Sequence, residues 1–578
     1  MQQDINLFNI SNEYFVGYVN KVDSYRVNVS TSNEEQLRKV NVNGYVIMNT
    51  ADPNTRLVGR IERVVRLEFE KDEASDDDSS NVNNDVTINA LGTLKGPRAG
   101  RERPSFTRAV ENLPEIGAEC YLLYSEYLTL FTGLIADETA KSKIPLSLGS
   151  YTMAANAHAL LDGNAFFQRH AMVVGSTGSG KSWTVAKIIE QVAGLENSNM
   201  VVFDLHGEYE PLAKHPNITR YRIAGPGDLD NPKEGVLFLP YWLLGYEDML
   251  ALILDRSDEN APNQAMAFSN AVISAKKAVL EAEKMHKELD TFTIDSPVPY
   301  SLDDVVKIIT ELNEQKVQGT KGPVNGPFNG KFNRFLPRLQ SKRSDRRHGF
   351  LFSLSQQQLA VNYLDSLVEK LMRANTENSQ GIKIIDFSEV PSDILPIVLS
   401  LVARLVFQVQ QWSDSTTRHP IALVCDEAHL YLPNRLAADA AEARALAHFE
   451  RIAKEGRKYG VSLLIISQRP SELNTTVMSQ CNNVVALRLS NQSDKSAVAN
   501  LLPENLGGIQ DQLPTLGVGE AIVVGDSCLL PSRIKIQKPE YQPNSGSVKF
   551  WDEWSKADKI QNLALAVQNL RRQNSTKE

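Results

Sequence analysis

The pattern of apolar and polar positions changes twice along the chain. Over residues 1–140, short apolar segments rich in β-branched and aromatic residues recur between Gly, Asn, Asp and Pro. Such residues favour strands, and the punctuating residues favour the turns between strands. The expected strands are 14–19, 44–50, 56–69, 120–124 and 128–135. Short strands at this density predict a small N-terminal β-barrel or sandwich.

One stretch of this first domain, residues 70–85, is acidic and polar, and it is followed by residues 91–105, which are rich in Gly, Pro and Arg. A segment with so few apolar residues cannot bury itself. We therefore predict a solvated, mobile loop that connects two strands.

From residue 169 onward, short apolar runs alternate with longer helical stretches. Residues 171–175, 182–195 and 200–209 follow the order strand, helix, strand, which makes a βαβ unit. Further strands are expected at 381–388, 420–432, 461–470, 482–490 and 519–526, with helices at 393–412 and 437–460. The pattern predicts an α/β domain around a parallel sheet, formed by residues 141–240 and 381–540.

The sequence between these two parts, residues 241–380, is largely helical, for example at 249–289 and 301–315. We expect it to be a helical insertion in the sheet domain. Residues 541–578 form a tail, and its segment 548–573 has the spacing of one amphipathic helix.

The composition is that of a globular protein. The chain has 578 residues, of which 42% are hydrophobic and 23% are charged, and this excludes a collagen-like or wholly disordered chain. The net charge of −9 predicts no general polyanion-binding surface, so contact with nucleic acid would need a local basic patch. The basic candidates are residues 141–145, residues 331–347 and Arg435.

The sequence predicts a protein of a reducing compartment that is cytoplasmic and does not span a membrane. The N-terminus lacks the basic start and apolar core of a signal peptide. The most apolar stretch, 397–409, contains Arg404 and is shorter than the roughly 20 residues that a span needs. The cysteines form no C-x-x-C pair, so neither a zinc site nor a disulfide framework is expected. They are Cys120, Cys425, Cys481 and Cys528.

The strongest chemical signal is GSTGSGKS at residues 175–182, which fits G-x-x-x-x-G-K-[ST] between a predicted strand and a predicted helix. Its glycines let backbone N–H groups curl around phosphate oxygens, and the helix start adds further donors. Lys181 would reach the β- and γ-phosphates of ATP or GTP, and the Ser182 hydroxyl suits Mg²⁺. The predicted nucleotide-binding residues are Gly175, Ser176, Thr177, Gly178, Ser179, Gly180, Lys181, Ser182 and Trp183.

A second signal lies in strand 420–432, where two adjacent carboxylates follow an apolar run. Asp426 suits Mg²⁺, directly or through water, and Glu427 suits a general base that activates water for attack on the γ-phosphate. In isolation the pair could equally be an acidic strand end that faces solvent. Beside a phosphate loop it predicts a multiple-turnover hydrolase.

Three more polar residues end predicted strands. Gln468 could sense the γ-phosphate or hold the attacking water, or it could cap the next turn. Asp204 and Glu208 end the strand at 200–209, and the carboxyl ends of parallel strands face the nucleotide crevice. Their role could be catalytic or structural.

Arginine candidates lie on the charged helical stretch that leads into the Gln468 strand. Arg451, Arg457 and Lys458 would ordinarily belong to a solvated helix face. The functional alternative places one arginine across a subunit boundary, where it completes the neighbour's nucleotide site.

Five segments together resemble the HerA family of hexameric ATP-driven DNA translocases and helicases, in the HerA–FtsK class. The resemblance spans about residues 140–535, and the DLHGEY, DEAH-LYLP and GRKYG-SQRP strings are far more specific than the phosphate loop. The DEAH string is not that of a DEAH-box RNA helicase, because the surrounding segments differ. The segments are RHAMVVGSTGSGKSWT (169–184), VVFDLHGEY (201–209), LVCDEAHLYLP (423–433), EGRKYGVSLLIISQRP (455–470) and NNVVALRLSN (482–491).

The resemblance implies a RecA-like P-loop ATPase core with an inserted helical subdomain, preceded by the β-barrel. It also implies a homo-hexamer around double-stranded DNA, with ATP sites between neighbours. Arg457, which matches the arginine of the family's GRKYG segment, would be the trans finger, and residues 541–578 would brace the adjacent subunit. Family members work with a nuclease in DNA end resection, or with a nuclease or an NAD-consuming sirtuin-like effector in antiphage defence. Residues 70–85 and 249–380 depart from the family pattern, which leaves the partner open.

Two other functions fit the same residues. A hexameric ATPase scaffold would assemble and regulate an effector with little DNA translocation, and DNA-stimulated ATP turnover separates it from a translocase. A coupling ATPase of the type IV secretion kind shares the core, but the missing transmembrane helices argue against it.

Overall fold

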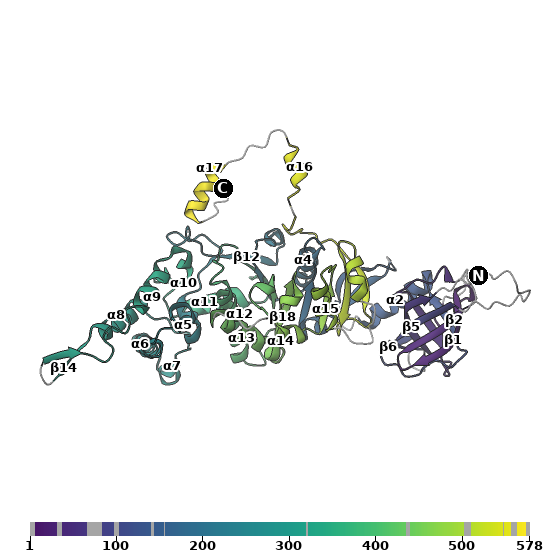
Figure 1. Cartoon of the computed structure of the whole chain (residues 1–578), viewed down its shortest axis with the longest axis horizontal. Helices are drawn as coiled ribbons and strands as arrows, with labels where there is room; N and C mark the ends of the chain where they lie inside the picture. The colour runs from purple at the N-terminus through teal and green to yellow at the C-terminus, as the bar shows by residue number, and fades with distance from the viewer. Residues whose placement is uncertain are drawn as a thin grey trace, which may run out of the picture. The chain divides into compact units, whose positions relative to one another are not determined.

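The computed structural model divides the chain into two compact units, whose helices and strands are shown in Figure 1. The first unit comprises Met1–Gln191, Ser467–Ser471 and Met478–Glu540, and the second comprises Val192–Ile466, Glu472–Val477 and Tyr541–Glu578. The described residues are 6–31, 37–65, 84–97, 103–139, 144–154, 156–319, 322–377, 379–434, 440–501, 510–546, 548–556 and 563–573.

The N-terminal strands form a closed antiparallel barrel, as the sequence predicts. They pair in the order β2-β1-β7-β3-β4-β5, and β5 pairs again with β2, which closes the ring. Val27 lies opposite Ile88 and Val29 opposite Val86, and all four are fully buried, so alternate residues fill the interior. The short strand β6 (Ser105–Thr107) pairs with β5 outside the ring. The barrel strands are β1 (Phe15–Asp23), β2 (Arg26–Thr31), β3 (Tyr45–Asn49), β4 (Thr55–Val65), β5 (Asn84–Lys95) and β7 (Glu119–Leu123).

Two expectations for this region are wrong. The segment 128–135 is not a strand but part of helix α2 (Ser125–Thr139). Its buried residues include Leu128, Phe131 and Ile135, which recur at the three- and four-residue spacing of a helix; the continuous apolar run hid that period. Residues 91–95 are not a loop but the end of β5, where Thr93 pairs with Thr107. Residues 70–83 of the predicted acidic loop lie outside the described residues.

The second unit contains six parallel strands in the order β13-β12-β16-β11-β17-β18. Every residue of β11, β16, β17 and β18 is buried, which explains why these strands read as continuous apolar runs. Four of the six strands were predicted, while β12 and β13 were not. The strands are β11 (Met200–Asp204), β12 (Ile218–Ile223), β13 (Val236–Leu237), β16 (Ile382–Asp386), β17 (Ile421–Cys425) and β18 (Val461–Ser467).

The sheet strands of the first unit correct the expectation of a wholly parallel sheet. Strands β10 and β19 are parallel, but β19, β20, β21, β8 and β9 follow one another in antiparallel pairs. Only a short connection, residues 526–531, separates β20 from β21. A parallel pair needs a crossover of about a dozen residues or more, so this spacing dictates an antiparallel pair. The strands are β8 (Leu146–Tyr151), β9 (His158–Leu161), β10 (Ala171–Val174), β19 (Asn483–Ala486), β20 (Glu520–Gly525) and β21 (Ser532–Ile536).

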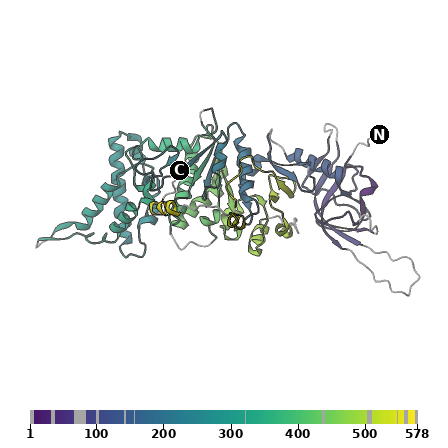
Figure 2. The same ribbon diagram turned by 90° about the horizontal axis from the view of Figure 1, so that it is seen from above.

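The insertion between β13 and β16 is mainly helical, as expected, but it also carries an antiparallel hairpin that the sequence analysis missed. The hairpin, β14 (Lys316–Gly319) and β15 (Gly322–Asn325), projects beyond α8 and is clearest in Figure 2. The helices are α5 (Tyr246–Ile253), α6 (Ala261–Ala282), α7 (His286–Thr291), α8 (Leu302–Glu314), α9 (Phe335–Ser344), α10 (Gly349–Phe352) and α11 (Tyr363–Met372).

Helix α12 (Leu395–Trp412) is long and apolar enough to cross a membrane, yet 67% of that 18-residue stretch is buried inside the protein. Its charged residue, Arg404, donates hydrogen bonds to the Leu243 carbonyl and, at 3.0 Å, to the Gln408 side chain. The predicted buried helix is thus confirmed. Helix α13 (Ala440–Glu455) packs along α12.

The C-terminal tail does not form the single helix that the spacing predicted. Helix α16 (Phe550–Trp554) ends at a C-cap on Ser555, and α17 (Leu563–Arg572) is a separate helix. Neither helix has a buried residue in this single chain, so no tertiary packing supports a longer one.

Candidate nucleotide site

The phosphate loop lies between the buried strand β10 and helix α4 (Lys181–Ala193). Gly178 and Gly180 have φ angles of +74° and +102°, a region that residues with a Cβ rarely adopt. A Cβ on Gly180 would also lie 3.2 Å from the backbone of Gly519, whose N–H donates to the Ser179 carbonyl at 2.9 Å. Glycine at position 180 therefore allows residues 517–519 to pack against the loop.

The loop has the features of an anion cradle. Within the described part of the chain, the N–H groups of Gly178 and Gly180 donate no hydrogen bond, and both precede the positive end of the α4 dipole. Lys181 follows at the first position of α4 and is only 7% exposed. Backbone donors, a helix N-terminus and a lysine in this order fit the triphosphate of ATP.

Gln468 contacts the phosphate loop. The Thr177 hydroxyl donates to the Gln468 side-chain oxygen at 2.6 Å, and the Gly175 N–H donates to the Ser467 carbonyl at 3.3 Å. Gln468 is half-buried. With its oxygen held by Thr177, the amide has a fixed orientation, which a sensor of the γ-phosphate requires.

In the second unit, Asp426 and Glu427 directly follow β17 and are 1% and 3% exposed. The Glu427 N–H donates to the Asp426 carboxylate at 3.0 Å, and the Glu427 carboxylate lies 3.4 Å from the His429 ring nitrogen Nδ1. Glu427 has φ +43° and ψ +43°, a left-handed conformation that is strained for a glutamate. The pair is therefore a buried acidic site and not the solvent-facing strand end of the alternative interpretation.

Asp204 anchors a turn at the end of β11. Its two carboxylate oxygens accept hydrogen bonds from the N–H groups of Glu208, at 3.0 Å, and Tyr209, at 2.9 Å. Burial, with a smaller effect from the charge of Asp386, raises the pKa of Asp204 to about 6. Glu208 is half-buried, and its carbonyl accepts a 2.7 Å hydrogen bond from the Asn544 N–H. The geometry of Asp204 favours the structural alternative that the sequence left open.

Tyr209 is a polar residue of this region that the sequence analysis missed. Its side chain is fully buried, and its hydroxyl forms no hydrogen bond with any described residue. Burial, together with the charges of Asp426 and Asp204, raises the pKa of Tyr209 well above 10. In the sequence DLHGEY, the tyrosine has the pattern of an ordinary core residue. Its position five residues after Asp204 was the only signal that could have identified it.

The two arginine candidates differ in their surroundings. Arg451 lies 3.4 Å from the Glu455 carboxylate, donates to Gln411 at 3.3 Å and stacks 5.1 Å from the Phe407 ring centroid. Arg457, on the 3-10 helix Gly456–Tyr459, is exposed, and its side chain has no partner among the described residues. Arg457 is thus the arginine that remains available to another molecule.

The residues proposed for Mg²⁺ are Ser182, in the first unit, and Asp426, in the second. A hydroxyl and a buried carboxylate are the oxygen ligands that Mg²⁺ prefers. Within the described ranges, no group of three or more His, Cys, Asp or Glu residues could hold a metal ion. The Mg²⁺ site at Ser182 and Asp426 stays a prediction.

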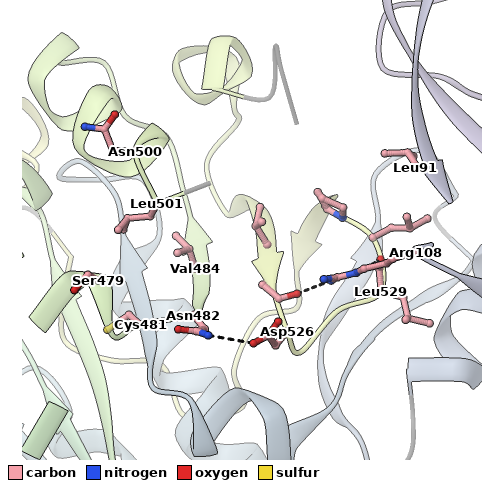
Figure 3. A pocket seen from close by; sticks show the side chains of 14 residues that line it. Leu91, Arg108, Ser479, Cys481, Asn482, Val484, Asn500, Leu501, Asp526 and Leu529 are labelled. Carbon is pink, nitrogen blue, oxygen red and sulfur yellow. Dashed lines mark hydrogen bonds between the residues drawn. The ribbon is translucent and has the colours of Figure 1, made fainter. Parts of the chain in front are cut away.

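A separate pocket of about 460 Å³ lies in the first unit, and its lining includes residues of the barrel strand β5 and of the sheet strands β19 and β20 (Figure 3). The Arg108 guanidinium donates to the carbonyls of Gly525, at 2.6 Å, of Leu529, at 2.8 Å, and of Cys528. Asp526 accepts from Asn482 at 3.2 Å. The charged groups of Arg108 and Asp526 are thus already hydrogen-bonded to backbone carbonyls and to Asn482. We therefore interpret the pocket as a structural contact and not as a ligand site.

Comparison with known proteins agrees with this geometry. The sequence model of a family described as "Helicase HerA, central domain" matches residues 146–406. A probable helicase of Methanocaldococcus jannaschii is 26% identical over 418 residues, which cover 71% of this chain and 70% of that protein. The DNA double-strand break repair helicase HerA of Saccharolobus solfataricus is 26% identical, over 69% of this chain and 70% of that protein. The DNA double-strand break repair helicase HerA of Pyrococcus furiosus is 24% identical, over 71% of this chain and 72% of that protein.

Among solved structures, VirB4 of Thermoanaerobacter pseudethanolicus aligns with a TM-score of 0.45 and 16% identity over 70% of this chain and 99% of that one. The plasmid coupling protein TrwB in complex with an ATP analogue aligns with a TM-score of 0.44 and 13% identity over 72% and 94%. The family match, the relatives and the phosphate loop agree with the segments that resembled HerA in sequence. Residues 146–406 thus match the HerA central domain, and the chain is similar to HerA helicases over about 70% of its length.

Proposed function

We propose that this ATPase is a ring-forming motor that moves along or unwinds double-stranded DNA. The observation that carries the proposal is the phosphate loop, with Gly180 packed on Gly519 and Thr177 bonded to Gln468. The names of the relatives, DNA double-strand break repair helicases, support DNA as the substrate.

In the proposed mechanism, each polar residue has one task. Lys181 holds the β- and γ-phosphates as a point charge, and the loop N–H groups bind the remaining oxygens. Glu427 accepts a proton from the attacking water, and Gln468 positions the γ-phosphate or that water. Ser182 and Asp426 would hold Mg²⁺, which supplies positive charge beside the phosphates.

The proposed assembly is a homo-hexamer in which Arg457 completes the nucleotide site of a neighbour. Its exposure and lack of a partner among the described residues support this role, because a trans finger must be free to reach another subunit. The exposed aromatic residues of α16, among them Trp551 at 80% and Trp554 at 74%, suit a tail that braces the adjacent subunit.

The basic run 331–347 is a weak candidate for the DNA contact. Five of its cations lie beside acidic groups. The distances include 3.1 Å for Lys342 and Asp393, 2.5 Å for Arg343 and Asp303, and 2.7 Å for Arg346 and Asp230. Arg435 and residues 141–143 lie outside the described residues.

A partner protein completes the proposal. From the family resemblance we infer a nuclease or an NAD-consuming sirtuin-like effector, with a role in DNA end processing or antiphage defence in the cytoplasm. Copurification of the chain with the product of a neighbouring gene tests this inference.

The motor function is tested by ATP turnover with and without duplex DNA. We expect duplex DNA to stimulate turnover, and the stimulation to weaken between about 50 and 200 mM salt, because phosphate contacts compete with counterions. Lys181→Ala is the control that sets the background. Strong ATP turnover that no DNA stimulates at low salt would favour the scaffold alternative.

A further inference from the structure

Trp183 stands at the exit of the phosphate loop, directly after Ser182 and on the first turn of α4. It is half-buried, and its indole N–H donates no hydrogen bond to any described residue. We propose that the indole face of Trp183 is the surface on which the base of the bound nucleotide stacks, so that this residue sets the affinity for the nucleoside part of ATP. The inference rests on the proposed binding of ATP at the phosphate loop.

A second segment, which follows β21, lies against the same ring. The Lys538 ammonium is 5.8 Å from the centroid of the Trp183 ring, and its side chain has no other partner among the described residues. The segment is tied to the loop, because the Ile536 N–H donates to the Gly519 carbonyl at 2.8 Å and Gly519 in turn contacts Ser179. The backbone at residue 536 is therefore joined to the phosphate loop through Gly519.

The direction of the nucleotide follows from the loop. Lys181 reaches the β- and γ-phosphates, so the α-phosphate lies at the other end of the triphosphate, toward the residues that follow Lys181 on the helix. The ribose and base are attached to the α-phosphate. Trp183 is the nearest large side chain in sequence beyond this end, and it is the aromatic residue with the largest π-face.

The cation over the ring indicates how the surface is used. An ammonium above an indole is attracted by the negative ring face, and this attraction is modest at an exposed site. Lys538 is exposed and can move away from the ring. A base stacks on an aromatic side chain more strongly, by about ten- to a hundredfold in affinity when the ring is removed. The base thus takes the place that the ammonium covers.

The competing explanation is that Trp183 only packs α4 against its surroundings. Three substitutions separate the two roles: Trp183→Phe keeps a π-face, Trp183→Leu keeps apolar bulk without one, and Trp183→Ala removes both. The probes are ATP and inorganic tripolyphosphate, which has the phosphates of ATP but no base. The full-length protein is used throughout, and thermal unfolding checks that each variant is folded.

We expect Trp183→Leu and Trp183→Ala to weaken ATP binding by about tenfold or more, Trp183→Phe by no more than about threefold, and none to change tripolyphosphate binding. Equal ATP binding by the Leu and Phe variants, or a matching loss for tripolyphosphate, would overturn the stacking role. Failure of the wild type to bind either probe would instead refute ATP binding at the loop.

Discussion

The hydroxyl of Thr177 donates a 2.6 Å hydrogen bond to the side-chain oxygen of Gln468, 291 positions further along the chain. This bond joins the phosphate loop to the residue that follows β18. Gln468 is therefore in direct contact with the phosphate loop, without any intervening residue. The bond also explains why a threonine, with a hydroxyl donor, is useful in a loop of glycines and serines.

The Thr177–Gln468 bond gives the first prediction. Thr177→Val keeps the shape of the side chain and removes the donor, so Gln468 loses its fixed orientation. We expect the turnover number to fall by about fivefold, which corresponds to the loss of one hydrogen bond of roughly 1 kcal/mol. Steady-state ATPase kinetics measure it. Thr177→Ser, which keeps the donor, should behave like the wild type, and equal loss in both variants would show that the hydroxyl is not what matters.

Lys181→Ala should abolish ATP hydrolysis, because the γ-phosphate loses its point charge in the transition state. Contacts of this kind contribute about 3–4 kcal/mol, or two to three orders of magnitude in rate. Phosphate release at saturating ATP measures the effect. Lys187→Ala is the matched control for helix stability. It removes another lysine of the same helix, whose ammonium lies 4.0 Å from the Glu190 carboxylate. More than about a tenth of the wild-type rate in Lys181→Ala contradicts the assignment.

Glu427→Gln should bind ATP but hydrolyse it slowly, since the amide keeps the shape of the side chain and loses the base. The variant should accumulate in an ATP-bound, assembled form. Nucleotide retention after gel filtration and a single-turnover assay measure the two effects. Wild-type turnover by Glu427→Gln would mean that another residue accepts the proton.

Arg457→Ala should leave nucleotide binding nearly intact and abolish turnover, because a finger of this kind contributes about 10³–10⁵ in rate. Arg451→Ala is the matched control: Arg451 is already engaged with Glu455 and Gln411, so its loss should leave turnover largely intact. Mass measurement under ATP and Mg²⁺ should find about six chains of 64.2 kDa.

A mixing experiment then tests whether Arg457 acts in trans. Subunits with Arg457→Ala and subunits with Lys181→Ala are each inactive, but a mixed ring contains interfaces where an intact Lys181 meets an intact Arg457. Some activity should return in such rings. Its complete absence in rings shown to be mixed would place Arg457 outside the neighbour's site.

Asp204 predicts a pH dependence of stability. Burial raises its pKa from 3.8 to about 6, so ionisation is less favourable in the folded chain than in the unfolded chain. The folded state therefore loses about 3 kcal/mol relative to the unfolded state as the pH rises from below about 3 to above about 7. Asp204→Asn cannot ionise, so its stability relative to the wild type should increase over this range. Chemical unfolding of both proteins at several pH values measures the change, and a constant difference would contradict it.

The sequence predicted the contiguous parts of the site better than the scattered ones. The phosphate loop could be recognised because backbone geometry alone dictates its glycines, and Gln468 because it ends an apolar strand. Tyr209 could not, since a buried aromatic residue gives the same pattern whether its hydroxyl faces carboxylates or only the core. The roles of Asp426, Glu427 and Arg457 stay predictions.

The fold divides in the same way. Strands that are buried on both faces, such as β11 and β17, were predicted from their apolar runs. Strand β12 has four half-buried residues in a row, and β21 alternates buried residues with half-buried or exposed ones, so neither forms a continuous apolar run and both were missed. Helix α2 was mistaken for a strand because eight mostly apolar residues show no clear period.

The left-handed backbone of Glu427 allows two selective pressures to be told apart. A glutamate in that conformation costs about 1 kcal/mol or more, and glycine or asparagine adopts it readily. A screen that rewards only survival of heating, and ignores turnover, should therefore enrich Glu427→Gly and Glu427→Asn among its winners. A selection that also requires ATP hydrolysis for growth should remove the same two substitutions. At position 427, the residues that give the highest heat tolerance would therefore differ from those that give the highest fitness.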